Sequence, residues 1–291
     1  MTHKLMTHKP LTRLLKFLLR KTTLLFSLGS LLVTLAACVM SMTPMAAASS
    51  GGAALAPAAT DSLLRQAKTH IREATDKGSI DSLKQARALA ERATSGSERT
   101  ALAHYYVGLA NYRLVNQLPE GAEPRRKHVL DDAVSHLKRA TTMDGKLADA
   151  WVLLSGCYGQ MMGMNPMRGM SLGPKANEAM EKAKNLDPKN PRVWMVSGTQ
   201  DYFTPSMFGG DKEQALEKFK KAARLAEQES VQDPLMPDWG HAEAYTWIGV
   251  AHMNAERYKK ARTAFETALK INPDYGWVKR VLLPKLDKKQ G

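Results

Sequence analysis

Small and apolar residues recur at helical spacing near the end of the chain, in a window that begins at Ala242. Twice in this window the apolar positions advance by three or four residues, which predicts two amphipathic helices joined by a short polar turn. Pro273 cannot continue a helix and marks the end of the unit. The positions that carry the pattern are Ala242, Tyr245, Ile248, Gly249, Ala261, Phe265, Ala268 and Pro273. We expect Gly249 to let the second helix approach closely and Phe265 to fill the space between the helices.

The same pattern recurs upstream, so the chain is built from internal repeats. Three units have long internal connections, which we place at residues 116–127, 161–174 and 204–210. Asp211 is expected to cap the helix after the third connection, and residues 276–286 are expected to form a short closing helix. The positions that define the earlier units are Val107, Gly108, Ala133, Leu137 and Ala140; Trp151, Leu154, Ser155, Tyr158, Ala176, Met180, Ala183 and Pro188; and Trp194, Gly198, Ala215, Phe219 and Ala222. The first pair, roughly 61–76 and 79–93, keeps Ala86, Ala90 and Ala93.

From about residue 61 to 286 the sequence resembles the tetratricopeptide repeat superfamily, whose units of about 34 residues each form one helix pair. The resemblance implies an all-α fold: a TPR-like α-solenoid of about five antiparallel helix pairs with a C-terminal capping helix, over residues 61–291. Insertions at equivalent positions of such repeats map to one face, so the three long connections are expected to share an edge.

The N-terminus has the order of an export signal. Six Lys and Arg residues without an acid precede an apolar run from Leu24 to Met40, and small residues close it. We therefore assign residues 1–48 to a signal peptide with two competing cleavage sites. Leu35-Ala36-Ala37-Cys38 resembles a lipobox, which would make Cys38 a lipidated first residue, whereas Met45-Ala46-Ala47-Ala48 resembles an ordinary site cut after Ala48. Residues 49–60, rich in Ser, Gly, Ala and Pro, are predicted to be a flexible linker.

Net charge and cysteine content limit the classes of partner and the disulfides that the chain can have. The net charge of +14 falls to +8 when the first 37 residues are removed, and the remaining cations are interspersed with acids. Together with export, this argues against nucleic acid as a partner. An exported or membrane-anchored protein facing the periplasm is expected. Cys157 would then be the sole cysteine besides Cys38, so no intramolecular disulfide is predicted.

No motif of catalysis or cofactor binding is present. The sequence lacks His-Glu-x-x-His, Gly-x-Ser-x-Gly, a phosphate loop and Cys-x-x-Cys, so we expect a binding protein rather than an enzyme, with no cofactor and no metal. His104 and His136 are predicted to approach across one helix pair, without the ligand set that a metal requires. A cluster of five methionines between Met161 and Met170 leaves Cu(I) binding open as an alternative to packing.

A binding groove is implied by the family resemblance, because first helices of such repeats line a concave face. The matching positions are aromatic and apolar and suit an extended peptide, a partner helix or an apolar ligand. The residues that we assign to the groove are Tyr105, Leu109, Tyr112, Arg113, Met195, Tyr202 and Phe203. Aromatic residues at helical spacing are also typical of a core, so the alternative is that other parts of the chain cover this face.

Two functions follow from these observations. The first is a scaffold of the cell envelope that binds a protein or peptide in its groove and is anchored to the membrane if Cys38 is lipidated. The second rests on Gly209-Gly210-Asp211 and on export, through which the chain resembles the T-component of periplasmic TRAP transport systems. It predicts a pocket for a small ligand, lined by Tyr105, Tyr112, Met195 and Tyr202.

Overall fold

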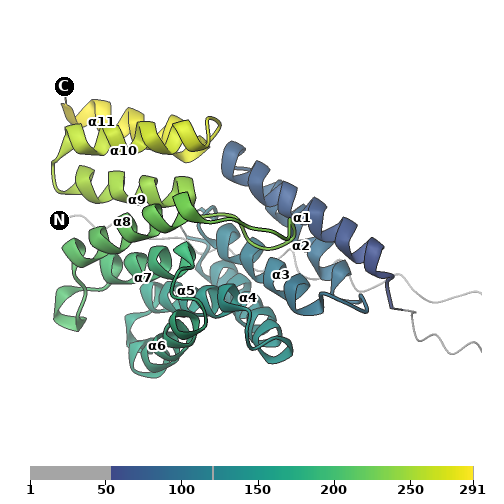
Figure 1. Ribbon diagram of the computed structural model, residues 1–291. Helices are drawn as coiled ribbons and strands as arrows, with labels where there is room; N and C mark the ends of the chain where they lie inside the picture. Colours follow the sequence, from purple (N-terminus) through teal and green to yellow (C-terminus); the bar gives the residue numbers. More distant parts are fainter. Residues whose placement is uncertain (1–53, 120, 291) are drawn as a thin grey trace, which may run out of the picture. The chain divides into compact units, whose positions relative to one another are not determined.

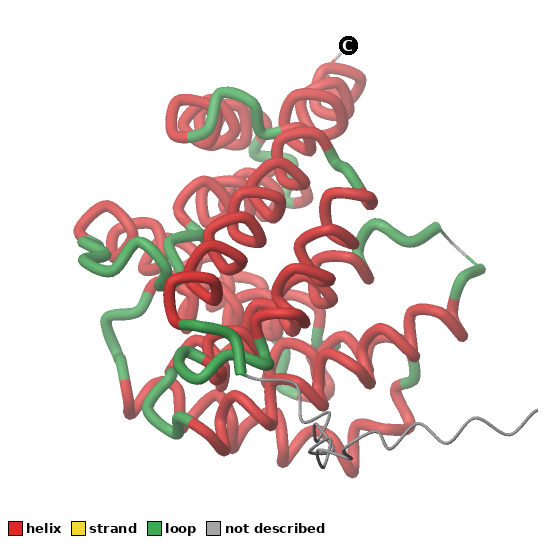
Figure 2. Tube along the Cα trace, turned by 90° about the vertical axis from the view of Figure 1, so that its right-hand side faces the viewer, coloured by secondary structure: helices red, strands yellow, loops and turns green. Residues whose placement is uncertain are grey.

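The computed structural model describes residues 54–119 and 121–290, and the regular secondary structure in this part of the chain is helical apart from one isolated bridge between Leu55 and Gly96 (Figures 1 and 2). The helices are α1 (Pro57–Lys77), α2 (Ile80–Ala93), α3 (Thr100–Val115), α4 (Glu123–Met143), α5 (Ala148–Met164), α6 (Gly169–Leu186), α7 (Pro191–Phe203), α8 (Lys212–Gln228), α9 (His241–Asn254), α10 (Tyr258–Ile271) and α11 (Leu283–Gln290). Short turns η1 (Pro166–Arg168) and η2 (Ser206–Phe208) lie between helices, and the π-helical segment η3 (Val278–Leu282) leads into α11.

Consecutive helices pack as five antiparallel pairs, from α1–α2 to α9–α10, and each pair also packs on the next. The segment η3–α11 covers the exposed side of the last pair. The predicted all-α solenoid of five pairs with a C-terminal cap is therefore confirmed.

Glycines on the first helices set the close packing within pairs. A Cβ atom added at Gly249 would lie 2.3 Å from the Phe265 ring, and one at Gly198 would lie 2.7 Å from the Phe219 ring. Both phenylalanine rings are fully buried. The aromatic side chain of the second helix thus rests on the bare backbone of the first, as the spacing predicted.

Several predicted boundaries differ from the structure. Helix α1 begins at Pro57, inside the predicted linker, and Leu55 N–H donates to Ser95 O at 3.0 Å. Proline is well suited to the first helical position, which explains the early start. The connection placed at 161–174 is mostly helical, because α5 runs to Met164 and α6 begins at Gly169, with Pro174 at an exposed position inside α6. Asp211 accepts from the N–H groups of Glu213 and Gln214 and caps α8 as expected.

One long connection was not predicted. Helix α8 ends at Gln228 and α9 begins at His241, so twelve residues join these two repeats, whereas four residues join α4 to α5 and α6 to α7. We call residues 229–240 the strap. The strap leaves the end of α8 and runs toward α1 and α3 (Figure 1).

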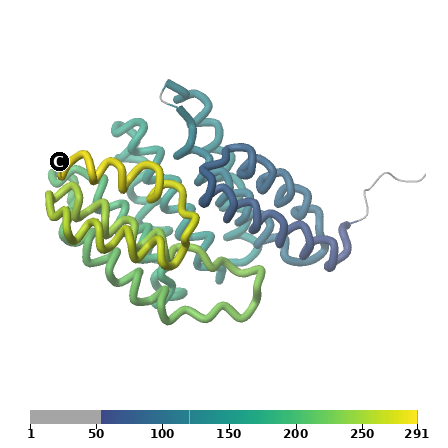
Figure 3. Tube along the Cα trace, turned by 90° about the horizontal axis from the view of Figure 1, so that it is seen from above, coloured from purple at the N-terminus to yellow at the C-terminus, as the bar shows by residue number. Residues whose placement is uncertain are grey.

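Helix α1 also contacts the C-terminal end of the array, at the turn after α10 and at η3, which lie near α1 in Figure 3. Asn272 Nδ2 donates to Asp76 Oδ1 at 2.8 Å, and the Arg280 guanidinium donates to Asp76 O at 3.1 Å. Within the described residues, no helix is both long and apolar enough to cross a membrane. The predicted apolar leader, Cys38 and both cleavage sites lie outside the described residues.

Candidate functional site

The seven predicted groove residues fall into two groups. At the N-terminal end, Tyr105 and Leu109 are buried completely or nearly so, and Tyr112 is half-buried. At the other end Met195 and Tyr202 are largely buried, whereas Phe203 is 68% exposed. The groove implied by the family resemblance is therefore not open along its whole length, and at its N-terminal end the structure agrees with the alternative that other parts of the chain cover this face.

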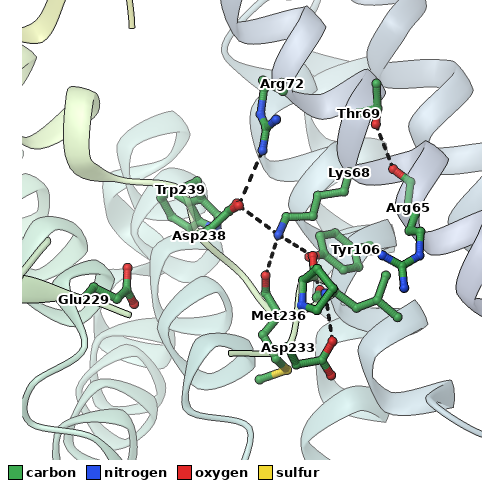
Figure 4. A network of polar contacts seen from close by, with 12 residues as sticks. Arg65, Lys68, Thr69, Arg72, Tyr106, Glu229, Asp233, Met236, Asp238 and Trp239 are labelled. Carbon is green, nitrogen blue, oxygen red and sulfur yellow. Dashed lines mark hydrogen bonds and ion pairs between the residues drawn. The ribbon is translucent and has the colours of Figure 1, made fainter. Parts of the chain in front are cut away.

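The strap fills the N-terminal part of the groove. Leu235 has no exposed surface, and its carbonyl accepts from the buried hydroxyl of Tyr106 at 2.5 Å. Lys68 Nζ donates to the carbonyls of Pro234 and Met236 at 2.8 and 2.7 Å (Figure 4). Side chains of α1 and α3 therefore bind the strap through its backbone and through one buried leucine.

Trp239, at the end of the strap, explains why Tyr105 is buried. Its indole N–H donates to the Tyr105 hydroxyl at 2.8 Å. The Arg113 guanidinium lies over the indole ring, 5.2 Å from its centroid, and donates to Glu243 at 2.9 Å. Burial raises the pKa of the Tyr105 hydroxyl well above its ordinary value, so this group acts as a neutral hydrogen-bonding partner. Tyr105 and Arg113 thus hold the chain's own strap.

Opposite charges flank the buried leucine. Asp233 pairs with Arg99 at 2.7 Å. Asp238 pairs with Lys68 at 3.0 Å and with Arg72 at 3.4 Å (Figure 4). The Leu235 N–H and Arg99 both lower the pKa of Asp233 below its ordinary value. The strap is acidic at both ends, and the surface that receives it is basic.

A buried arginine of α7 binds both ends of the strap. Arg192, on α7, is almost fully buried and binds Asp149 and Glu229, the latter through two nitrogens at 2.6 and 3.0 Å. It also donates to the Trp239 carbonyl at 3.2 Å. Arg192 thereby ties the first residue of the strap to its penultimate one.

A hollow of about 550 Å³ lies beside this arginine, lined by the start of the strap and by Asp149, Asn190 and Arg192. None of the four residues expected to line a small-ligand pocket, Tyr105, Tyr112, Met195 and Tyr202, lines it.

The C-terminal end of the groove carries an aromatic cluster, which we define as Tyr202, Phe203, Trp247 and Trp277. The Phe203 and Trp247 rings are 5.6 Å apart, as are the Trp247 and Trp277 rings. Trp247 stacks at 5.8 Å on the buried Phe219, which holds it in place. The turn η2, separated from the end of α7 by two residues, carries the exposed side chains of Met207 and Phe208. Among the described residues, the ring contacts of this cluster involve no residue of the strap, and Phe203 remains largely exposed.

His104 and His136 do meet, with their Nδ1 atoms 2.8 Å apart. Glu91, Asp132 and His136 also lie close enough to hold a metal ion, with ligand atoms within 4.8 Å of one another. However, Arg87 donates to Glu91 at 2.8 Å and pairs with Asp132 at 3.2 Å, so a guanidinium already neutralises both carboxylates. This arrangement fits an ion-pair network at the α2–α4 junction better than a metal site.

Acidification is expected to destabilise the protein through His104. Burial, followed by His136 and Arg139, lowers the pKa of His104 to about 4. Since the unfolded state binds a proton near pH 6.5 and the folded state does not, stability falls as the pH drops from about 6.5 to about 4. We expect a His104→Gln variant to lose part of this dependence, measured as urea-unfolding free energy at pH 7 and pH 4.5. His70→Gln, at a partly exposed histidine of α1, is the control. An identical pH dependence in wild type and His104→Gln would contradict the prediction.

The methionines between Met161 and Met170 do not gather at one point. Met161 is buried, and Met162 and Met164 pack against the core, whereas Met167 and Met170 are almost fully exposed. Packing explains the first three, and the copper hypothesis gains no support from this arrangement.

Comparisons with known proteins agree with the fold. Residues 242–275 match the family model described as tetratricopeptide repeat. The HusA haemophore from Porphyromonas gingivalis has a TM-score of 0.57 and 21% identity, covering 68% of this chain and 94% of that one. A thermophilic TPR protein from Thermus thermophilus, TTC0263, has a TM-score of 0.53 and 15% identity, covering 76% of this chain and 98% of that one. A search of curated protein sequences finds no match. Residues 242–275 thus form a tetratricopeptide repeat, and the described chain as a whole has an all-α, TPR-like fold, a helical scaffold that fits protein–protein interaction.

Proposed function

We propose that this protein is an exported scaffold that binds a partner protein or peptide of the cell envelope through its aromatic cluster. The observation that carries the proposal is Phe203, a large aromatic side chain that is 68% exposed and packs on Trp247, which in turn packs on Trp277. Aromatic side chains supported by a packed surface are typical of binding hot spots. Met207 and Phe208, in the nearby turn η2, are also exposed apolar side chains, and methionine adapts to partners of varied shape.

Removing the exposed rings is expected to weaken partner binding strongly without unfolding the protein. A tagged Phe203→Ala/Phe208→Ala variant should retain about tenfold less of the specific partner, as is typical for the loss of a hot spot. The measurement is affinity capture from the envelope fraction with quantitative mass spectrometry. Met143→Ala, at an exposed apolar residue at the end of α4, is the matched control. If the double variant retains the same proteins as the control, the aromatic cluster is not the binding surface.

Export and anchoring follow from the leader and are part of the proposal. If Cys38 is the lipidated first residue, metabolic labelling with an alkynyl fatty acid should mark the protein, and Cys38→Ser should remove the label and release the protein from membranes. If the chain is instead cut after Ala48, the mature protein begins at Ser49, carries no label and is unaffected by Cys38→Ser. Intact-mass analysis of the mature protein distinguishes the two forms, and an uncleaved cytosolic protein would contradict export altogether.

A second candidate is the binding of a flat apolar ligand at the same cluster. It is favoured by the four neighbouring rings and by the similarity of the fold to a haemophore. Titration with haem, followed by its absorption, tests it. Stoichiometric binding that Phe203→Ala weakens would support this candidate over the protein partner, and haem binding unchanged in that variant would count against it.

A further inference from the structure

The strap is bound to the rest of the protein in the way that a recognised peptide is bound. Its carbonyls at Pro234, Leu235 and Met236 accept hydrogen bonds from the side chains of Lys68 and Tyr106. Leu235 fills a fully buried site. A connection that only had to join α8 to α9 needs none of these contacts, since four residues suffice at two other repeat junctions.

The chemistry of the strap is specific. Its central part, Asp233-Pro234-Leu235-Met236-Pro237-Asp238-Trp239, places an apolar pair between prolines and an acid on each side. Prolines restrict the unbound segment and so reduce the entropy that binding costs. The acids meet Arg99 on one side and Lys68 and Arg72 on the other. The receiving surface therefore selects an extended segment with an apolar centre and acidic flanks.

We propose that the surface formed by α1 and α3 is a recognition site for a partner segment of this chemistry, and that the strap occupies it as a competitor within the same chain. The inference rests on the proposed role in protein binding, but it concerns a surface separate from the aromatic cluster. Because the strap is tethered at both ends, its effective concentration is on the order of millimolar, and a partner segment must displace it. The strap thus keeps the buried leucine site covered until a stronger or multivalent partner arrives.

Binding of the strap sequence as a separate peptide tests the proposal. In a strap-replaced variant, residues 233–239 of the full chain become Gly and Ser at equal length. A fluorescent peptide of residues 229–240 should bind this variant at least tenfold more tightly than it binds wild type. A control peptide with lysine at both Asp233 and Asp238 should bind neither protein. Equal binding to wild type and variant, or no binding to a folded variant, would overturn the proposal.

Hydrogen exchange of the unmodified protein gives an answer even if the strap-replaced variant does not fold. The amides of Leu235 and Met236 should exchange through local opening, at a lower free energy than the buried amides of α3. If strap and α3 amides exchange only together, the strap cannot be displaced from the folded protein and the proposal fails. Binding of the strap peptide should be unchanged when Phe203→Ala is added to the strap-replaced variant. The peptide measurement therefore tests the site on α1 and α3 independently of the proposed function of the aromatic cluster.

Discussion

Replacing Arg192 by alanine is expected to destabilise the protein by about 3–5 kcal/mol, the usual cost of breaking a buried ion pair from one side. The side chain is almost fully buried, and its loss leaves Asp149 buried without its cation. Glu229 and the Trp239 carbonyl lose their donors at the same time. Urea unfolding followed by circular dichroism measures the effect. Proteolysis within the strap should also become faster, because Arg192 ties both of its ends.

Arg257→Ala is the matched control. Arg257, the residue before α10, also donates a hydrogen bond to a glutamate, Glu213, at 3.2 Å. However, the Glu213 side chain is 70% exposed. Exposed ion pairs contribute at most about 1 kcal/mol, so this variant should remain close to wild type. Similar losses in both variants would show that the Arg192 network is no more important for stability than a surface pair.

Phe265→Ala is expected to cost about 3–5 kcal/mol, as is typical for deleting a fully buried aromatic ring. The ring lies directly on Gly249, which has no side chain that could move into the cavity left by the ring. In a repeat array the loss is concentrated in the affected pair and its neighbours. We therefore expect α9, α10 and α11 to unfold first, seen as a broadened urea transition and as faster hydrogen exchange in these helices.

Phe203→Ala provides the comparison for this variant. It deletes the same side chain from an exposed position, so it should change the unfolding free energy by less than about 1 kcal/mol. The two phenylalanines are thus expected to have opposite roles: Phe265 for stability and Phe203 for binding. A large loss of stability in Phe203→Ala would mean that this ring is part of the fold.

The aromatic residues of the groove illustrate the limits of helical spacing as a signal. The family resemblance assigns both Tyr105 and Phe203 to positions that line the groove, yet one is fully buried and the other largely exposed. The difference comes from Trp239, which reaches Tyr105 from a segment more than a hundred residues away. The strap itself leaves a trace in the sequence, in the excess length between Ala222 and Ala242 and in Pro234 and Pro237, but that trace does not say where the segment lies.

The sequence by itself determined the helix pairs, their number and the cap, because each pair requires only local periodicity, small residues where its two helices touch, and a proline or capping residue at its ends. Gly249 with Phe265, Gly198 with Phe219 and Asp211 at the start of α8 were all readable in this way. Only the tertiary structure decided which part of the groove is open. The contacts that close it, from Lys68, Tyr106 and Arg192 to the strap, join residues far apart in the sequence, and no local pattern encodes such pairings.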